Sequence, residues 1–372
     1  MIGRFVNRIL LLVNVLAIIG LVLCYASAHL NPLQFSLITL FSLTYPYFVA
    51  INIGFILFWA VIRKYYLIFS LIALLFGYNS LNNNFQFLPK NTYVDTVPGI
   101  TFKVMSYNVH IFDLYRWSKK GETRDKMFEF IRSENPNIAC FQEYYNGKKN
   151  FYPVHDSLMM NQNFRYAHVY YTDNIGVLQR FGIATYSTYP IVNKGIIRFP
   201  NTRNVSIYSD IKIKNDTIRV FNCHLESIRF LPEDYNFIDS LVTQRDKPQI
   251  NGAKGVKKRL ENAFKKRAVQ THLLTEQIVK SPYPIVLAGD FNDPPSSYTY
   301  THLTESLNDS FVEKGKGKGA TFSRNIFAYR IDYILYSKHL QCIDFYVPKV
   351  DYSDHFPIIG NYKIPAKNNK IK

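Results

Sequence analysis

The chain has 372 residues and a formal net charge of +17, and its length exceeds that of one average domain. Its four cysteines show no CxxC spacing, which argues against a disulfide framework and against a cysteine zinc site. Residues 1–99 hold five basic residues and one acidic residue, so +13 of the charge falls on residues 100–372. Such a basic surface indicates a polyanionic partner, either nucleic acid or an anionic membrane, or else serves solubility beside a bilayer.

Residues 1–81 have the composition of a membrane region. Apolar stretches at 9–28 and 36–62 are long enough to cross a hydrocarbon core, which needs about 20 residues, and a third at 65–81 lies near the lower limit. Three transmembrane helices are therefore expected. A reentrant or interfacial helix is the alternative for the third stretch, and a cleavable signal peptide is the alternative for the first.

The basic residues around these stretches predict the topology. Arg4 and Arg8 precede the first stretch, Arg63 and Lys64 separate the second from the third, and the link between the first two carries no basic residue. The positive-inside rule puts both basic sites in the cytoplasm. The chain is then a multi-pass protein of the cytoplasmic membrane whose remaining residues lie on the extracytoplasmic side, and cleavage of the first stretch would not change that side.

A polar linker is expected at residues 82–100, and short strand-like runs dominate the domain predicted at 101–365. The runs are 101–107, 138–142, 181–186, 205–213, 218–224, 285–288, 331–336 and 358–362. Helical spacing appears only at 126–133 and 257–279, and residues 226–256 resemble no element and are expected to form an insertion loop near the substrate. Many strands and few helices predict an α/β (α+β) fold of two packed sheets with helices outside.

Polar side chains follow six of these strands at the point where each apolar run ends or begins. They are Asn108, Glu143, His224, Asp290 with Asn292, Asp332, and Asp354 with His355. Such positions combine the rigidity of a sheet with access to solvent. Asp290 and Asn292 lie two residues apart, so an extended chain would put them on the same side.

The residue types indicate a metal site that is rich in oxygen. Glu143, Asp290 and Asp354, with the amides of Asn108 and Asn292, are hard ligands that suit Mg²⁺, Mn²⁺ or Ca²⁺ better than zinc. Magnesium is preferred because it bridges readily to a phosphate and neutralises charge there, with Mn²⁺ as the alternative.

Histidines beside such a site supply a base for water or a donor to phosphoryl oxygens. Asp332 is expected to fix the tautomer of His355. Each motif is weak alone, since an isolated Asn is more often a turn former and an isolated Asp-His pair is usually part of a solvated loop. The six motifs together, in one order across a span that fits one domain, carry the prediction.

In these motifs the chain resembles the endonuclease/exonuclease/phosphatase superfamily, which has the deoxyribonuclease I-like fold. The resemblance covers residues 101–362 through KVMSYNVHIF, IACFQEYY, RVFNCHLES, PIVLAGDFNDPP, RIDYILYS and DYSDHFPI. It implies a four-layer sandwich of two central β-sheets flanked by helices, here preceded by an all-helical transmembrane segment. It also implies metal-dependent cleavage of phosphoesters.

The resemblance further implies a role for each site residue. Glu143 would be the principal metal ligand, assisted by Asn108 and by Asp354. The catalytic residues would be His224, Asp290, Asn292, Asp332 and His355. In these roles Asp290 and Asn292 position water and hold phosphate, His355 paired with Asp332 acts as base or transition-state donor, and His224 lies near the leaving group.

The substrate stays open at this stage. The membrane segment favours a phospholipid or sugar phosphate, whereas the basic, tyrosine-rich domain favours nucleic acid. The basic residues in 257–267 could face either a membrane or a nucleic acid, or form an ordinary solvated helix face. A membrane interaction module that kept the fold without the chemistry is the alternative from another class, and the presence of all eight site residues argues against it.

Overall fold

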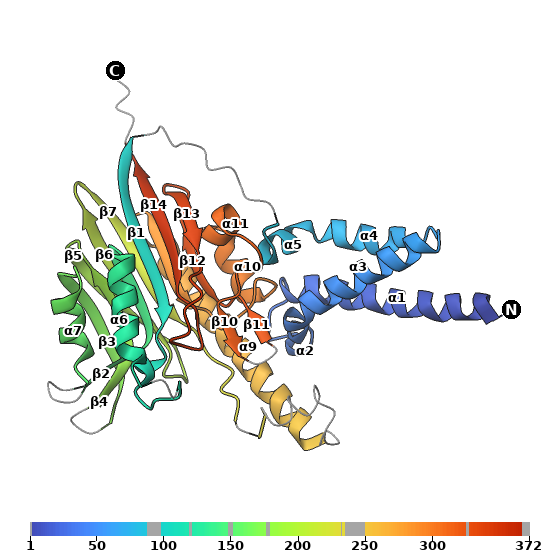
Figure 1. The fold of residues 1–372 in the computed structure, drawn as a ribbon, viewed down its shortest axis with the longest axis horizontal. Coiled ribbons are helices and arrows are strands. Elements are labelled where there is room, and N and C mark those ends of the chain that lie inside the picture. Colours follow the sequence, from blue (N-terminus) through green and yellow to red (C-terminus); the bar gives the residue numbers. More distant parts are fainter. Residues whose placement is uncertain are drawn as a thin grey trace. The chain divides into compact units, whose positions relative to one another are not determined.

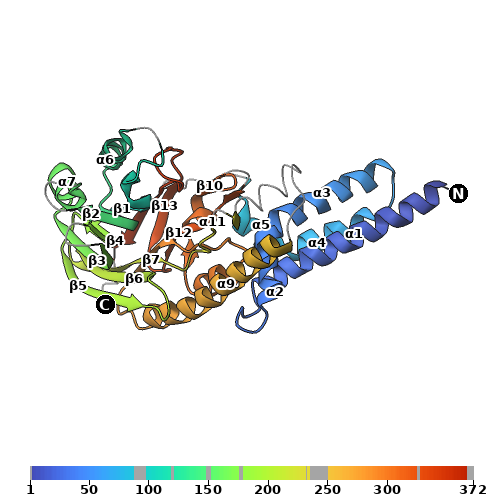
Figure 2. The same cartoon turned by 90° about the horizontal axis from the view of Figure 1, so that it is seen from below.

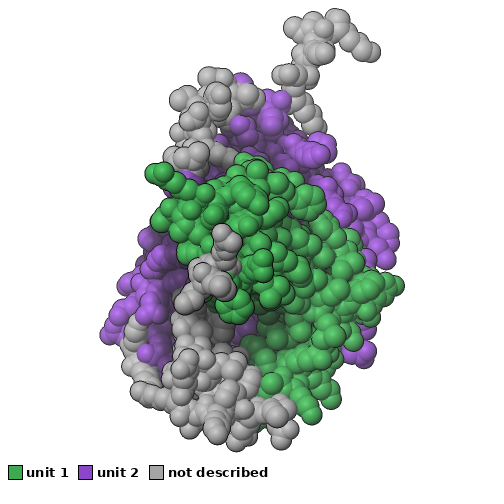
Figure 3. Space-filling view, turned by 90° about the vertical axis from the view of Figure 1, so that its right-hand side faces the viewer, with its two compact units in different colours: residues 1–84, 226–269, 293–302 green, residues 85–225, 270–292, 303–372 purple. Residues whose placement is uncertain are grey.

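The computed structural model describes residues 2–87, 98–118, 121–147, 152–175, 179–231, 233–234, 250–324 and 327–366. These form two compact units, which Figure 3 colours separately. The first unit comprises residues 1–84, 226–269 and 293–302, and the second comprises 85–225, 270–292 and 303–372. Most of the predicted linker, at 88–97, and part of the predicted insertion loop, at 235–249, lie outside the described residues.

The first unit begins with helices, as the apolar composition predicts. They are α1 (Ile2–Ser27), α2 (Ser36–Thr39), the 3₁₀ helix η1 (Leu40–Thr44), α3 (Tyr45–Val61), α4 (Leu67–Phe76) and α5 (Tyr78–Asn84). Two helical stretches, Phe5–Ser27 and Ser36–Val61, are long and apolar enough to cross a membrane. The third predicted stretch, 65–81, forms the shorter apolar helix α4 and then α5, with Gly77 between them.

Many large apolar side chains of these helices are exposed, with Leu57 62% and Phe76 81% accessible, although others such as Leu21 and Trp59 are buried. Polar side chains buried among the helices include those of Asn14, Asn52 and Ser70. Soluble domains bury apolar and expose polar side chains, whereas polar groups in membrane helices face the bundle interior.

The second unit is an α+β sandwich of two mixed sheets flanked by helices (Figure 1), which confirms the predicted fold class. The first sheet has the strand order β13-β14-β1-β2-β4-β3, and the second has the order β5-β6-β7-β8-β12-β9. The strands of the first sheet are β1 (Gly99–Asn108), β2 (Ile138–Gly147), β3 (Tyr166–Ile175), β4 (Gln179–Ser187), β13 (Gln341–Tyr346) and β14 (Ile358–Pro365). Those of the second are β5 (Ile191–Arg198), β6 (Val205–Ile213), β7 (Asp216–His224), β8 (Ile285–Asp290), β9 (Asn308–Asp309) and β12 (Asp332–Tyr336). A small separate sheet pairs β10 (Phe322–Arg324) with β11 (Phe327–Tyr329).

Alternating side chains of β1 build two different cores. Phe102 and Val104 pack against the second sheet, in a cluster with Val220 of β7. Met105 and Tyr107 point to the opposite face and pack under two helices, α6 (Thr123–Glu134) and α7 (Val154–Asn161), which lie beside this sheet in Figure 2. The period of two along a strand thus fills the space between the sheets and also anchors the outer helices.

All eight strand-like runs form strands, and the two helical patterns form α6 and α9 (Ile250–Val279). The prediction that residues 226–256 resemble no element is wrong at its end, because α9 begins at Ile250. The first residues of α9 include Gly252 and Gly255, which are poor helix formers, and Lys254, so they show no helical spacing of apolar side chains. The sequence analysis did not identify several short helices, among them α7, η2 (His110–Asp113), α10 (Tyr298–Thr304) and α11 (Ser310–Lys314).

Candidate active site

Strand pairing brings the predicted site residues to one end of each sheet. β1 and β2 are parallel, and so are β7 and β8, so their carboxyl ends lie together in each pair. β12 is antiparallel to β8 and begins with Asp332 opposite Asp290, while His224 ends β7 beside the same residue. β14 is antiparallel to β1, so the segment before it returns to the end of β1.

The two sheets meet at one buried carboxylate oxygen, Oδ2 of Asp290, a residue that is 1% exposed. Asn108 of the first sheet donates its side-chain amide to this oxygen at 3.0 Å and to Glu143 Oε1 at 3.3 Å. The Nε2 atoms of His224 and His355 lie 3.9 Å and 3.8 Å from the same oxygen. Asn108, His224 and His355 therefore lie around this one atom, and Glu143 joins the group through Asn108.

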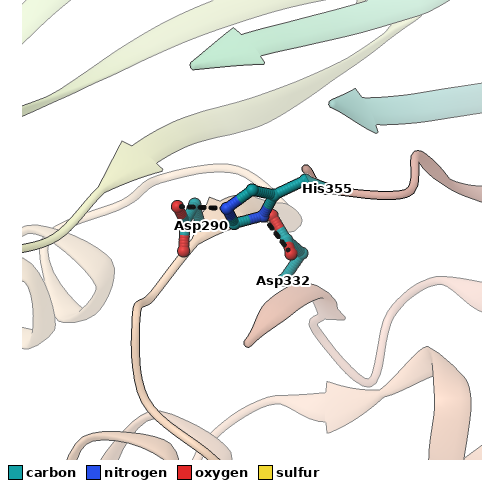
Figure 4. A group of neighbouring side chains, drawn as sticks. All are labelled: Asp290, Asp332 and His355. Atoms are coloured by element: carbon teal, nitrogen blue, oxygen red, sulfur yellow. Dashed lines mark hydrogen bonds and ion pairs between the residues drawn. The ribbon is translucent and has the colours of Figure 1, made fainter. Parts of the chain in front are cut away.

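Asp332 forms a hydrogen bond with His355 on the side of the imidazole ring that faces away from Asp290. Asp332 Oδ2 lies 2.9 Å from His355 Nδ1, and Figure 4 shows the ring between this carboxylate and that of Asp290. The Phe322 ring lies 5.1 Å from the imidazole, centroid to centroid. A hydrogen bond at Nδ1 fixes the ring so that Nε2 faces Asp290.

Burial and mutual charge shift the protonation of this group. Burial alone lowers the pKa of His355, but Asp332 and Asp290 outweigh it and raise the pKa to about 10. Burial and then the charge of Asp332 raise the pKa of Asp290 to about 6, although both neighbouring histidines and Asn108 oppose the shift. Burial thus disfavours the charged form of Asp290, whereas the two carboxylates favour the charged form of His355.

A break in the β2 ladder turns Glu143 toward the site. The pairing register with β4 shifts between Phe141 and Tyr144, and Glu143 has a left-handed backbone with φ of 48°. Gln142, one residue earlier, already points between the sheets and donates to Asn222 at 2.7 Å. Regular alternation would send Glu143 to the opposite face, so the bulge is what lets adjacent residues share one side.

Asp290 and Asn292 lie close together, but not because an extended chain alternates its side chains. The segment that follows β8 is not extended, so that part of the prediction is wrong. Asn292 has a left-handed backbone, with φ of 54°, and its N–H donates to Asp290 Oδ1 at 2.9 Å. Its side-chain amide donates to the Leu225 carbonyl at 3.1 Å. Gly289 is required because a Cβ there would lie 2.0 Å from the Cys223 carbonyl oxygen. A local turn therefore keeps the two residues together.

His224 carries the one unsatisfied atom of the described site residues. Its Nε2 is buried, has no hydrogen-bond partner, and lies 3.9 Å from both Glu143 Oε1 and Asp290 Oδ2. Buried nitrogen atoms in proteins are normally paired, so this geometry leaves a place for a ligand atom between the imidazole and the carboxylates.

Asp354 stands apart from the group around Asp290. Its carboxylate lies 3.5 Å from His110 Nδ1 and 3.4 Å from the Ser353 hydroxyl. His110, which the sequence analysis did not single out, also donates its backbone N–H to Asn108 Oδ1 at 3.1 Å. The available signal was its position two residues after Asn108 in SYNVHIF, since the end of β1 leads directly into the site.

The oxygen donors at this edge fit a divalent cation. Asp290, Asp332 and His355 have ligand atoms that all lie within 4.8 Å of one another. The Nδ1 atom of His355 is already bonded to Asp332, so Glu143 supplies the further carboxylate on the Asp290 side, where Asn108 presents its amide nitrogen.

Comparison with known proteins gives the same picture. The Endonuclease/Exonuclease/phosphatase family matches residues 105–355, and a domain of unknown function (DUF8431) matches residues 7–84. An endonuclease/exonuclease/phosphatase family protein from Bacteroides thetaiotaomicron has a similar structure, with a TM-score of 0.52, 17% identity and coverage of 72% of this chain and 99% of that one. The human Nocturnin catalytic domain with bound sulfate anion gives a TM-score of 0.50 at 17% identity and coverage of 74% and 96%. No curated protein matches the chain. With more than half of its residues matched, the chain belongs to the Endonuclease/Exonuclease/phosphatase family.

Proposed function

We propose that this protein is a membrane-held phosphoesterase that hydrolyses phosphodiester or phosphomonoester bonds with a divalent metal. The observation that carries the proposal is the approach of Asn108, His224 and His355 to Asp290 Oδ2, with Glu143 beside Asn108 and an unpaired nitrogen on His224. Carboxylates gathered in this way suit a cation, and an unpaired imidazole nitrogen beside them suits an anionic substrate.

Glu143, Asn108 and Asp290 are the residues that would hold the metal, with Asp354 as a further predicted ligand. Magnesium is the proposed ion and Mn²⁺ the alternative, because the carboxylates supply hard oxygen ligands. The Asn108 oxygen accepts from the His110 N–H, so the Asn108 amide would have to turn to reach the ion. When bound, the ion supplies positive charge that polarises the phosphoryl group.

The chain's own groups supply proton transfer and orientation. Asp290 accepts a hydrogen bond from the attacking water, and the turn at Asn292 holds the Asp290 carboxylate in place. Asp332 fixes His355 so that its Nε2 faces the reacting group. His224 Nε2 has no hydrogen-bond partner in the structure, so it can donate to a phosphoryl or leaving-group oxygen of the substrate.

Membrane attachment through α1, α3 and α4 is the second part of the proposal. It is supported by helices that expose leucine and phenylalanine and bury asparagine and serine, since water would disfavour that arrangement. A third crossing would need α4 and α5 together, since α4 alone has 10 residues; with that crossing the positive-inside rule leaves the active site on the extracytoplasmic side. A phospholipid or sugar phosphate is then the favoured substrate.

One observation favours nucleic acid as a second candidate. Trp117 and Tyr115 are 50% and 55% exposed, and the Trp117 ring stacks on His110 with centroids 4.1 Å apart. His110 contacts both Asn108 and Asp354, so an exposed aromatic surface adjoins the site. Successive bases bind to such surfaces by stacking.

Hydrolysis of bis(p-nitrophenyl) phosphate by the full chain in detergent micelles tests the chemistry. Turnover should require Mg²⁺ or Mn²⁺, stop with chelator, and fall at least about 100-fold in Asp290→Asn. Asp216→Asn is the matched control, because it removes a charge at the opposite end of β7 from His224. Activity that persists in chelator, or equal activity in both variants, would refute the proposal. A panel of phospholipid vesicles, sugar phosphates, DNA and RNA then separates the two candidate substrates.

A further inference from the structure

A second charged feature of the catalytic unit lies outside the group around Asp290. The sequence alternates lysine and glycine from Lys314 to Gly319, and in the structure this run borders a cavity of about 400 Å³. Four lysines line it, Lys314, Lys316, Lys318 and Lys349, and one acidic residue, Asp344. The lining therefore carries a net charge of about +3, which is complementary to one or two phosphate groups.

The lysine run has a fixed backbone. Gly317 exchanges both backbone hydrogen bonds with Gln86, each at 2.9 Å. Gly319 has φ of +57°, and a Cβ there would lie 2.3 Å from the Phe311 ring, so glycine is required at this position. Lys316 and Lys318 are exposed and form no ion pair with any residue that the structure describes. The run therefore presents two uncompensated ammonium groups from a preorganised loop, which lowers the entropic cost of binding an anion.

Lys349 joins the cavity to the catalytic site. Its ammonium donates to the Ala320 carbonyl at 2.6 Å and lies 4.1 Å from the centre of the Phe356 ring, next to His355 in the chain. Partial burial lowers the pKa of Lys349. The Phe356 N–H donates to the Thr321 carbonyl at 2.6 Å.

The same short segment touches the catalytic residues. Phe322 forms an isolated bridge with His355, and the Thr321 hydroxyl accepts from the Asp332 N–H at 3.1 Å. Ala320 therefore lines the cavity, and the next two residues contact the catalytic residues, so one short segment borders both sites.

We propose that the lysine cavity binds a phosphate group of the substrate other than the one that is cleaved. This assignment rests on the proposed phosphoesterase function. It narrows the substrate to phosphoesters that carry at least two phosphate groups, whether in a nucleotide chain or in a phosphorylated lipid headgroup.

Binding of inorganic pyrophosphate tests the cavity without catalysis. The full chain in detergent micelles is titrated calorimetrically with pyrophosphate in the presence of chelator, so that no metal draws the anion to the carboxylates. The double variant Lys316→Ala/Lys318→Ala should bind about tenfold more weakly than the unaltered chain. The matched control Lys212→Ala/Lys338→Ala, two exposed lysines at the strand ends far from His224 and Asp332, should bind as the unaltered chain does. No binding by the unaltered chain, or equal binding by all three proteins, overturns the proposal.

Kinetics identify the source of the phosphate. The dinucleotides TpT and pTpT differ by one terminal phosphate, and vesicles of phosphatidylcholine with or without phosphatidylinositol 4-phosphate make the same comparison for lipid. In the cavity variant KM should rise about tenfold only where the second phosphate is present, at unchanged kcat, and KM for bis(p-nitrophenyl) phosphate should not change. An equal rise in KM for substrates with one and two phosphates overturns the proposal. If no substrate is turned over, the phosphoesterase function fails, whereas the pyrophosphate titration still decides whether the cavity binds phosphate.

Discussion

Two buried polar clusters, one among the N-terminal helices and one at the strand ends, differ in how completely they are paired. Among the helices, Asn14 donates to Ser70 at 2.7 Å, Ser70 donates to Asn52 at 2.9 Å, and Trp59 donates to Asn14 at 2.9 Å. All four side chains are neutral and fully buried, and each is bonded to another member. Such a cluster joins α1, α3 and α4 and leaves no atom for a ligand.

The cluster at the strand ends is charged and incompletely paired. Asp290 has its pKa raised by burial, and the Nε2 atom of His224 has no hydrogen-bond partner. An unpaired buried atom costs stability, and proteins keep such costs at sites that bind or react. The two clusters therefore differ in pairing, although unpaired buried atoms such as Tyr45 Oη also occur elsewhere, so it is the unpaired atom beside carboxylates at the family's motifs that distinguishes the strand-end cluster.

A third buried cluster is charged, but its charges are paired with one another. Arg267 is fully buried, pairs with Asp293 through two nitrogens at 3.0 Å each, and donates to the Glu226 carbonyl at 2.8 Å. This residue belongs to the basic run that the sequence left open as a membrane or nucleic-acid surface. Lys266 and Arg259 of the same run also pair with carboxylates, at 3.0 Å and 2.7 Å. Charged groups that are paired in this way hold the fold together, and they leave less charge for a partner.

The largest effect is expected from Asp332→Asn. Its carboxylate fixes His355 in one orientation, so turnover of bis(p-nitrophenyl) phosphate should fall about 100-fold to 10,000-fold. The midpoint of thermal unfolding should change little, because the variant keeps the shape of the side chain. A variant that unfolds early yet retains activity per folded molecule would place Asp332 among the structural clusters instead.

Arg267→Ala should lower the stability of the fold rather than the turnover per folded molecule. Removing one partner of a buried ion pair leaves Asp293 uncompensated, which should lower the free energy of unfolding by about 3–5 kcal/mol. Thermal unfolding of the full chain in detergent, followed by circular dichroism, measures the loss. The double variant Arg267→Met/Asp293→Leu removes both charges and should lose less. Equal losses in the single and double variants would show that packing, and not the unpaired charge, is responsible.

His168 offers a pH-dependent test inside the catalytic unit. Burial, with a smaller contribution from Lys194, lowers its pKa from 6.5 to about 4, and its Nδ1 lies 3.0 Å from the Ser209 hydroxyl. The unfolded chain takes up a proton near pH 6.5 whereas the folded chain does not. Stability is therefore full above pH 6.5 and falls between pH 6.5 and 4, by at most about 3 kcal/mol. The unfolding midpoint should therefore fall less steeply with falling pH in His168→Gln than in the unaltered chain. The same dependence on pH in both proteins would exclude this residue as the cause.

The smallest effect is expected from Asn14→Leu. It leaves Trp59 Nε1 without its acceptor and Ser70 with Asn52 alone, and it should cost about 1–2 kcal/mol of stability in detergent, with turnover per folded molecule unchanged. Leu12→Ala is the control, because Leu12 is 61% exposed on the same helix. A fall in turnover without a fall in stability would contradict the structural role of the cluster.

Much of this protein follows from local sequence patterns. Apolar runs of about 20 residues predict the N-terminal helices, and short β-branched runs predict the strands, because both patterns depend on neighbouring residues alone. Asn108, His224, Asp290 and Asp332 were identifiable because each begins or ends a strand, whereas Glu143 lies inside β2 and His355 lies just before β14. The resemblance carried by these motifs predicted the family that the comparison shows.

Only the tertiary structure decided how those residues meet. The left-handed backbones of Glu143 and Asn292 depend on neighbouring strands, so periodicity alone gave a wrong account of Asn292. The partners of Arg267, Glu226 and Asp293, lie far away in the chain, and folding buries all three together. Lys316 and Lys318 stay exposed, so their charges remain available. Sequence therefore determined which groups are present and where strands end, whereas long-range packing determined which of those groups remain unpaired.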